Sequence, residues 1–112
     1  MSSPYSPVFA AGEWRCISGQ IGLAGGGLPD TFAGQVDAAL ANLGRLLEEH
    51  GLRPAQVAKT TVFLADMADY AEMNEHYTRF FGDHRPARSA VAVAALPFDA
   101  LVEIEAWAHT GL

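Results

Sequence analysis

The sequence has one cysteine, few basic residues and no long hydrophobic run among its 112 residues. Because Cys16 has no second cysteine to pair with, the chain can form no internal disulfide, CxxC redox motif or zinc ribbon. No window approaches the ~20 apolar residues of a membrane-spanning helix, and the first residues lack the basic and apolar regions of a secretion signal. We therefore expect a cytoplasmic protein with no membrane partner.

Positively charged residues are also scarce. Seven Lys and Arg residues stand against thirteen Asp and Glu residues, which gives a formal net charge of −6. Such a balance opposes binding to phosphate backbones unless the basic residues cluster. The closest grouping, Arg79, Arg85 and Arg88, is interrupted by Asp83 and by apolar residues. We therefore expect no nucleic-acid partner. The chain also lacks paired His or Cys residues at ligand spacing, so we expect no metal site.

Half of the residues are hydrophobic, enough for a modest core, and we expect a single domain over residues 1–112. Short runs of branched and aromatic residues predict strands, and apolar residues at intervals of three and four predict helices. The predicted elements are strands at 5–10 and 14–18, a helix within 30–50, a strand at 57–64 and a helix within 69–82.

The last quarter of the chain contains two further apolar runs, Ser89–Leu96 and Leu101–Ala108, separated by Pro97-Phe98-Asp99. We interpret them as two strands paired in a hairpin. Alternation along the second strand places Glu103 and Glu105 on one face with Trp107. The complete order, β-β-α-β-α-β-β, predicts an α+β fold with both helices on one face of the sheet.

Three positions are candidates for a binding site on residue type alone. Arg88 offers a planar guanidinium suited to a carboxylate, although a surface ion pair is an equally good interpretation. Gly19, between Ser18 and Gln20, lets a ligand or another backbone approach closely, although a bend without a ligand is equally plausible. Tyr70 begins the second helix, where its ring could line the edge of a pocket.

The sequence resembles a known family in several motifs that occur in the family's order. PARSAV (86–91), ALP (95–97) and VEIEAWA (102–108) resemble the signature of the RidA family, the YjgF-type reactive-intermediate deaminases. PYSP (4–7), ISGQI (17–21), KTTVFLADM (59–67) and MNEHYTRFFGD (73–83) continue the resemblance over nearly the whole chain.

The resemblance implies a chorismate-mutase-like fold that assembles as a homotrimer, with ligand clefts between subunits. It implies hydrolysis of 2-imino acids, such as 2-iminopropanoate and 2-iminobutanoate, to 2-oxo acids and ammonia without a metal or organic cofactor. Arg88 would hold the substrate carboxylate and Glu103 the attacking water. Ser18 and Gly19 would approach with their backbone, and Tyr5 and Tyr70 would wall the pocket.

One departure from the family pattern stands near the arginine. Many members have a cysteine two residues after it, where this chain has Ala90. Any ligand contact or redox sensitivity of that thiol is therefore absent. Glu105 matches no known family role, and we expect a structural or interfacial one.

The predicted hairpin also constrains the site. If Leu96 pairs with Leu101, then Glu103 lies opposite Ala94, six residues from Arg88. At ~3.3 Å per residue the two side chains are on the order of 20 Å apart, too far to grip one small molecule. We therefore expect each site to combine Arg88 of one subunit with Glu103 of its neighbour.

Two other functions fit the same residues. One is a non-catalytic trimer that binds or senses a small carboxylic acid, and the other is a pathway-specific aminoacrylate deaminase. The presence of both Arg88 and Glu103 favours catalysis, because binding alone requires only the arginine.

Overall fold

The structure is a computed structural model that describes residues 3–112; Met1 and Ser2, the first two residues of the predicted domain, lie outside the described residues. Five strands form one sheet in the order β1-β2-β5-β3-β4. The strands are β1 (Val8–Ala11), β2 (Trp14–Gln20), β3 (Val57–Leu64), β4 (Ala87–Ala92) and β5 (Val102–His109). The helices are α1 (Phe32–Glu49) and α2 (Tyr70–Phe81), and three short 3-10 turns lie at 54–56, 67–69 and 97–99. Between residues 3 and 112 no helix is both long and apolar enough to cross a membrane.

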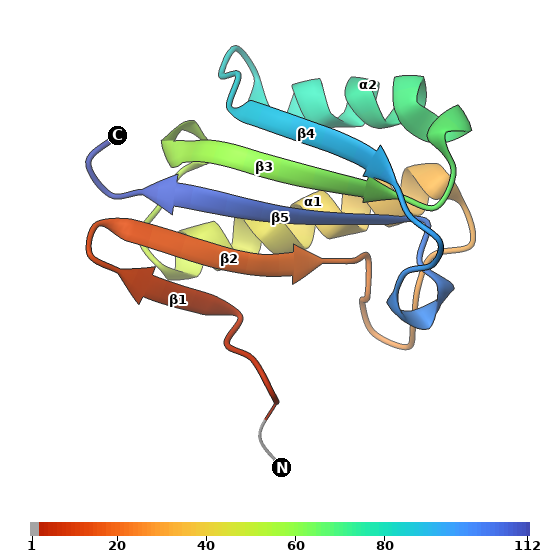
Figure 1. Cartoon of the computed structure of the whole chain (residues 1–112), viewed down its shortest axis with the longest axis horizontal. Coiled ribbons are helices and arrows are strands. Elements are labelled where there is room, and N and C mark those ends of the chain that lie inside the picture. The colour runs from red at the N-terminus through yellow and green to blue at the C-terminus, as the bar shows by residue number, and fades with distance from the viewer. Residues whose placement is uncertain (1–2) are drawn as a thin grey trace.

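Both helices cover the same face of the sheet, as predicted (Figure 1). The topology gives the reason. β3 and β4 pair in parallel, and β2 and β3 run in the same direction on either side of β5. The chain therefore passes from β2 to β3 through α1 and from β3 to β4 through α2, moving the same way across the sheet each time. Because such crossovers are almost always right-handed, the two helices lie on one side.

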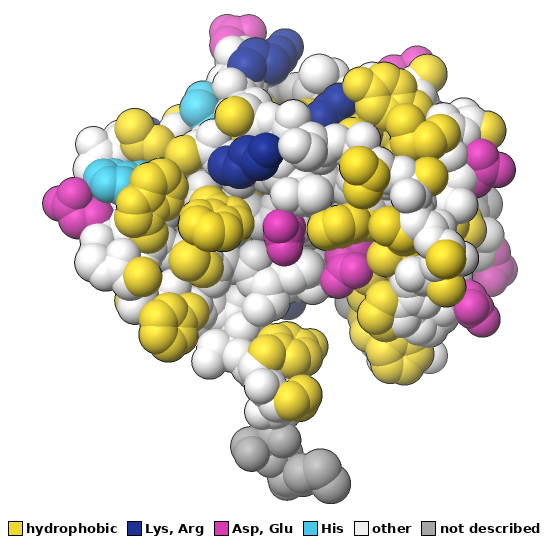
Figure 2. All heavy atoms as spheres, in the orientation of Figure 1, with side chains coloured by type: hydrophobic (Ala, Val, Ile, Leu, Met, Phe, Trp, Pro, Cys, Tyr) yellow, Lys and Arg dark blue, Asp and Glu magenta, His cyan; other side chains and the backbone are white. Residues whose placement is uncertain are grey.

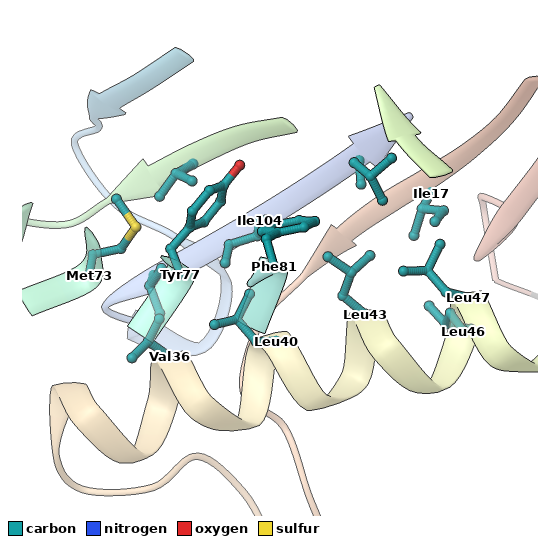
Figure 3. Packing of buried hydrophobic residues seen from close by; sticks show 14 of the residues in the cluster. Ile17, Val36, Leu40, Leu43, Leu46, Leu47, Met73, Tyr77, Phe81 and Ile104 are labelled. Carbon is teal, nitrogen blue, oxygen red and sulfur yellow. The ribbon is translucent and has the colours of Figure 1, made fainter. Parts of the chain in front are cut away.

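The core lies between this face and the helices. α1 buries the stripe Val36, Leu40, Leu43 and Leu47, which Figure 3 shows directed toward Ile104 and the other sheet residues. α2 adds Met73, Tyr77 and Phe81 from its own buried side. A polar pair in the core, Thr60 Oγ1 and Tyr77 Oη, is hydrogen-bonded at 2.7 Å, so neither buried hydroxyl is left without a partner.

The predicted helices and the strand at 57–64 are confirmed. Thr31 caps α1 by accepting a hydrogen bond from the Gly34 amide, 3.0 Å long. Gly82 follows α2 with a φ of +64°, a left-handed conformation that favours glycine. The first strand begins at Val8 rather than at Tyr5, and β2 continues to Gln20, beyond the predicted end at Ser18.

The predicted hairpin is wrong. β4 ends at Ala92 and pairs only with β3, whereas β5 lies between β2 and β3. The segment 93–101 therefore carries the chain past β3 instead of turning back on β4. The physical reason is the strand-helix-strand unit of β3, α2 and β4: its crossover pairs the two strands in parallel and occupies the free edge of β3.

Among the described residues no helix covers the second face of the sheet (Figure 1), and Figure 2 shows hydrophobic side chains over this face. The predicted alternation is confirmed here, since Val102, Ile104 and Ala106 are buried under the helices while Glu103 and Glu105 face the other way with Trp107. Large hydrophobic side chains remain exposed on this face, among them Phe9, Trp14, Val91 and Trp107. We call it the open face. An exposed apolar surface of this kind is typical of a protein interaction site.

Candidate functional site

A β-bulge sits beside Glu103. The pairing of β2 with β5 shifts by one residue between Ile17 and Gln20, so Gly19 lies at an irregularity in the ladder. A Cβ atom added at Gly19 would lie only 2.7 Å from Glu103 Cδ. Only glycine leaves room for the carboxylate. The bend interpretation of Gly19 is confirmed as a bulge, and the Glu103 side chain lies against its bare backbone. The approach of a ligand to Gly19 stays a prediction.

Glu103 is half-buried in a cavity of about 300 Å³. The cavity is lined by Tyr5, Gly19, Gln20, Ile21, Leu23, Asn42, Arg45, Pro97, Phe98 and Glu103. Burial raises the pKa of the Glu103 carboxyl, and the neighbouring Glu105 carboxylate raises it further. A carboxyl with a raised pKa is a stronger base once it is ionised, which suits it to taking a proton from water.

Tyr5 and Gly19 lie with Glu103 in this cavity, but Ser18 does not. Ser18 lines an adjacent hollow of about 340 Å³ on the open face, together with Glu105 and Trp107. Its hydroxyl donates to the Ser6 carbonyl at 2.7 Å, and its amide donates to the Pro7 carbonyl at 3.0 Å. Ser18 therefore holds the N-terminal segment in place and so positions Tyr5, which lines both hollows.

Arg88 lies against α2. Its Nη2 donates to the Tyr70 hydroxyl at 3.0 Å, and its guanidinium carbon lies 4.8 Å from the centre of the Tyr77 ring. Within residues 3–112 no carboxylate lies within 4.0 Å of this guanidinium as an ion-pair partner. The structure therefore does not support the surface ion-pair interpretation. A guanidinium has five N–H donors, so one that is held by aromatic rings and a single hydroxyl retains further donors for an incoming anion.

Arg88 and Glu103 lie on opposite faces of the sheet. Arg88 is aligned with Thr60, which is buried under the helices, whereas Glu103 is aligned with Phe63 on the open face. Two strand spacings and three residues separate their Cα atoms, roughly 14 Å. The distance of 20 Å expected from the hairpin is therefore wrong, because β4 and β5 are not neighbours. The two side chains nevertheless do not meet within one chain, because the sheet lies between them.

Several residues that surround the two groups are not among the site residues predicted from the sequence. Met73 and Tyr77 support the Arg88 guanidinium, with Nη1 3.9 Å from Met73 Sδ. The helical spacing of Tyr70, Met73 and Tyr77 was a signal for their common face. Leu23 and Phe98 line the Glu103 cavity from two loops, and no local pattern could have found them.

Ala90 points toward the core from β4, and Cys16 is partly buried on β2. The two positions are on different strands, so Cys16 does not replace the thiol that many family members have near Arg88. Among the residues that the structure describes, no three His, Cys, Asp or Glu side chains are placed to hold a metal ion.

Comparison with known proteins gives one consistent result. Residues 1–110 match the family described as Endoribonuclease L-PSP. A mouse 2-iminobutanoate/2-iminopropanoate deaminase is 43% identical over 111 residues, which is 96% of this chain and 82% of the relative. A RutC family protein of Pyrococcus horikoshii is 42% identical over 109 residues, which is 95% of this chain and 86% of the relative.

Solved structures agree. The YjgF gene product of E. coli superimposes with a TM-score of 0.90 at 40% identity, covering 95% of this chain and 87% of that one. E. coli TdcF with bound serine superimposes with a TM-score of 0.91 at 36% identity, covering 97% and 90%. The sheet order, the covered helical face and the matched sequence thus lead to one conclusion: this chain belongs to the Endoribonuclease L-PSP family, the family of YjgF and RidA.

Proposed function

We propose that this protein hydrolyses 2-imino acids such as 2-iminopropanoate and 2-iminobutanoate to 2-oxo acids and ammonia. The observation that carries the proposal is the Glu103 carboxylate, which has a raised pKa, lies against the bare backbone of Gly19 and faces a cavity. Relatives from mouse, rat and human that are 40–44% identical are named 2-iminobutanoate/2-iminopropanoate deaminase.

The reaction needs little more than positioned water. An iminium carbon is already electrophilic, so Glu103 orients a water molecule and removes its proton as the oxygen attacks that carbon. Glu103 then returns this proton to the nitrogen of the resulting carbinolamine. As the carbon–nitrogen bond breaks and ammonia leaves, the ionised Glu103 accepts the hydroxyl proton, so the oxygen lone pair forms the carbonyl of the 2-oxo acid. Holding water and imine in contact converts a bimolecular step into a unimolecular one, which accounts for most of such a rate enhancement.

Arg88 binds the substrate carboxylate in this proposal. Its guanidinium is held by Tyr70 and Tyr77, and no carboxylate among residues 3–112 is in ion-pair contact with it. A bidentate pair with the substrate carboxylate fixes the orientation of the imine carbon as well as its position. Because Arg88 and Glu103 lie on opposite faces of one sheet, the proposed site joins Arg88 of one subunit to Glu103 of the next in a homotrimer.

A second candidate function is binding of a small amino or carboxylic acid without catalysis. E. coli TdcF, which has the same fold at 36% identity, has been solved with bound serine, and the Arg88 half of the site would suit such a ligand equally well. A pathway-specific aminoacrylate deaminase is a third reading that uses the same residues with a different pocket volume.

The first experiment generates 2-iminobutanoate in situ with an amino-acid oxidase and traps the remaining imine with semicarbazide. The wild-type protein should suppress the trapped product, and Arg88→Ala should not. Arg88→Lys keeps the charge but loses the planar fork, so it should recover only part of the activity. Arg79→Ala is the matched control, because Arg79 is an exposed arginine on α2 that donates to the Glu75 carbonyl.

Glu103→Gln separates catalysis from binding. Under the deaminase proposal this variant still binds a carboxylic acid through Arg88 but no longer accelerates hydrolysis. If wild-type protein binds serine or a 2-oxo acid in calorimetry yet leaves the semicarbazide product unchanged, the binding function replaces the enzymatic one.

A further inference from the structure

Phe98 combines two features that rarely occur together. Its φ is +60°, and that of Asp99 is +56°, both in the left-handed region that disfavours side chains with a Cβ atom. Its ring is also 73% exposed, so burial in this chain does not compensate for the unfavourable backbone conformation. Residues held in such conformations are concentrated at ligand clamps and active sites.

The Phe98 side chain borders the Glu103 cavity. On its other side is a second hollow, of about 490 Å³, above the glycine-rich loop 24–27. Leu23 and Phe98 line both spaces, so these two side chains form the partition between them. Any substrate group that extends from the reacting carbon toward this end of the cavity meets the Phe98 ring.

The two side-chain amides that line the Glu103 cavity are already hydrogen-bonded within the chain. Asn42 donates to the carbonyls of Ile21 and Leu23 at 2.9 and 3.0 Å, and its Oδ1 accepts from Arg45 at 2.8 Å. Gln20 donates to the Ser18 carbonyl at 2.9 Å. Apart from Tyr5, Gly19, Arg45 and Glu103, the remaining lining of the cavity is apolar: Ile21, Leu23, Pro97 and Phe98.

We propose that Phe98, with Leu23, forms an apolar subsite that selects 2-imino acids with branched aliphatic or aromatic side chains. The inference rests on the proposed function and adds the substrate class. The carboxylate of Glu103 lies in the same cavity, so a substrate whose imine carbon faces it directs its side chain into the apolar end. Because removal of apolar groups from water favours binding, larger apolar side chains are preferred over the methyl group of 2-iminopropanoate.

The test compares imines that an amino-acid oxidase generates from L-leucine, L-phenylalanine and L-2-aminobutyrate. We expect Phe98→Asn to lower kcat/KM for the leucine- and phenylalanine-derived imines by about tenfold or more, the scale of a lost apolar contact. The value for 2-iminobutanoate should change by less than about threefold. Asn tolerates positive φ, so the melting temperature should not fall. Phe98→Leu keeps an apolar side chain and should retain much of the preference, and Leu23→Ala should shift it in the same direction as Phe98→Asn.

The outcomes separate the two proposals. If wild-type protein leaves all three imines untouched, the proposed function fails and this subsite with it. If wild type hydrolyses 2-iminobutanoate and Phe98→Asn leaves the substrate ratios unchanged, only the subsite is overturned. If Phe98→Asn slows all substrates equally and light scattering shows a smaller assembly, Phe98 packs between subunits and the subsite is likewise overturned.

Discussion

The Glu103 carboxylate occupies the space in which a side chain at position 19 would lie. The bulge in β2 thus determines where Glu103 of β5 can lie. Because Gly19 has no Cβ atom, the Glu103 side chain can lie against the backbone of β2 and line the cavity. A side chain at position 19 and the Glu103 carboxylate exclude each other, so Gly19 belongs to the candidate site because it has no side chain.

Gly19→Ala should therefore displace Glu103 and reduce imine hydrolysis by about 100-fold, since a misplacement of about 1 Å can cost that much. Substrate binding through Arg88 should change little, so the loss should appear in kcat more than in KM. Gly44→Ala is the control: it adds the same methyl group on α1, where the nearest atom is Phe80 Cε1 at 3.2 Å. Equal activity of Gly19→Ala and wild type would exclude Glu103 from the chemistry.

Mixed assemblies test whether the site joins two subunits. Arg88→Ala and Glu103→Gln should each be inactive alone. Unfolding and refolding them together should restore on the order of a quarter of wild-type activity, because one interface in four then pairs an intact Arg88 with an intact Glu103 in a ring of random composition. If the mixture stays inactive while native electrophoresis shows mixed assemblies, both residues act from the same chain.

The pH dependence of hydrolysis should report Glu103. The carboxyl must be ionised to accept a proton, so kcat/KM should rise with pH through a pKa above the usual 4.5 of a glutamate. Glu105→Gln removes the neighbouring negative charge that contributes to the raised pKa, so the acidic limb of the profile should move to lower pH. A limb that stays in place would show that Glu105 does not act on the catalytic group.

Glu103 should also cost the protein stability at neutral pH. Because its pKa is raised on folding, the folded protein holds this proton to higher pH than the unfolded chain does. The favourable contribution of the protonated carboxyl to the free energy of unfolding is fully present below the pKa of the unfolded chain. It is lost as the pH rises through the pKa of the folded protein. Gln does not ionise, so Glu103→Gln should have the higher melting temperature at neutral pH. The difference in melting temperature should shrink below pH 4.5. Thermal unfolding of both proteins at neutral pH and below pH 4.5 will check this.

Most of the local structure could be predicted from the sequence. The apolar spacing within 30–50 and 69–82 defines both helices, and the alternation in β5 places Glu103 and Glu105 on the face opposite Ile104. These properties depend on neighbours within a few residues, where backbone geometry alone sets the period of the side chains. The order of elements further predicts an α+β sheet with both helices on one face, and the observed strand order supplies the reason through its right-handed crossovers.

Strand pairing was decided only by the tertiary structure. β5 inserts between β2 and β3, although its nearest strand in sequence is β4. Local patterns predict that Ser89–Leu96 and Leu101–Ala108 form strands but carry no information about their partners, because pairing depends on burial shared by distant segments. The division of the candidate site follows from this pairing. With β3 between their strands, Arg88 is in register with the buried Thr60 and Glu103 with Phe63, so the two side chains point to opposite faces of the sheet.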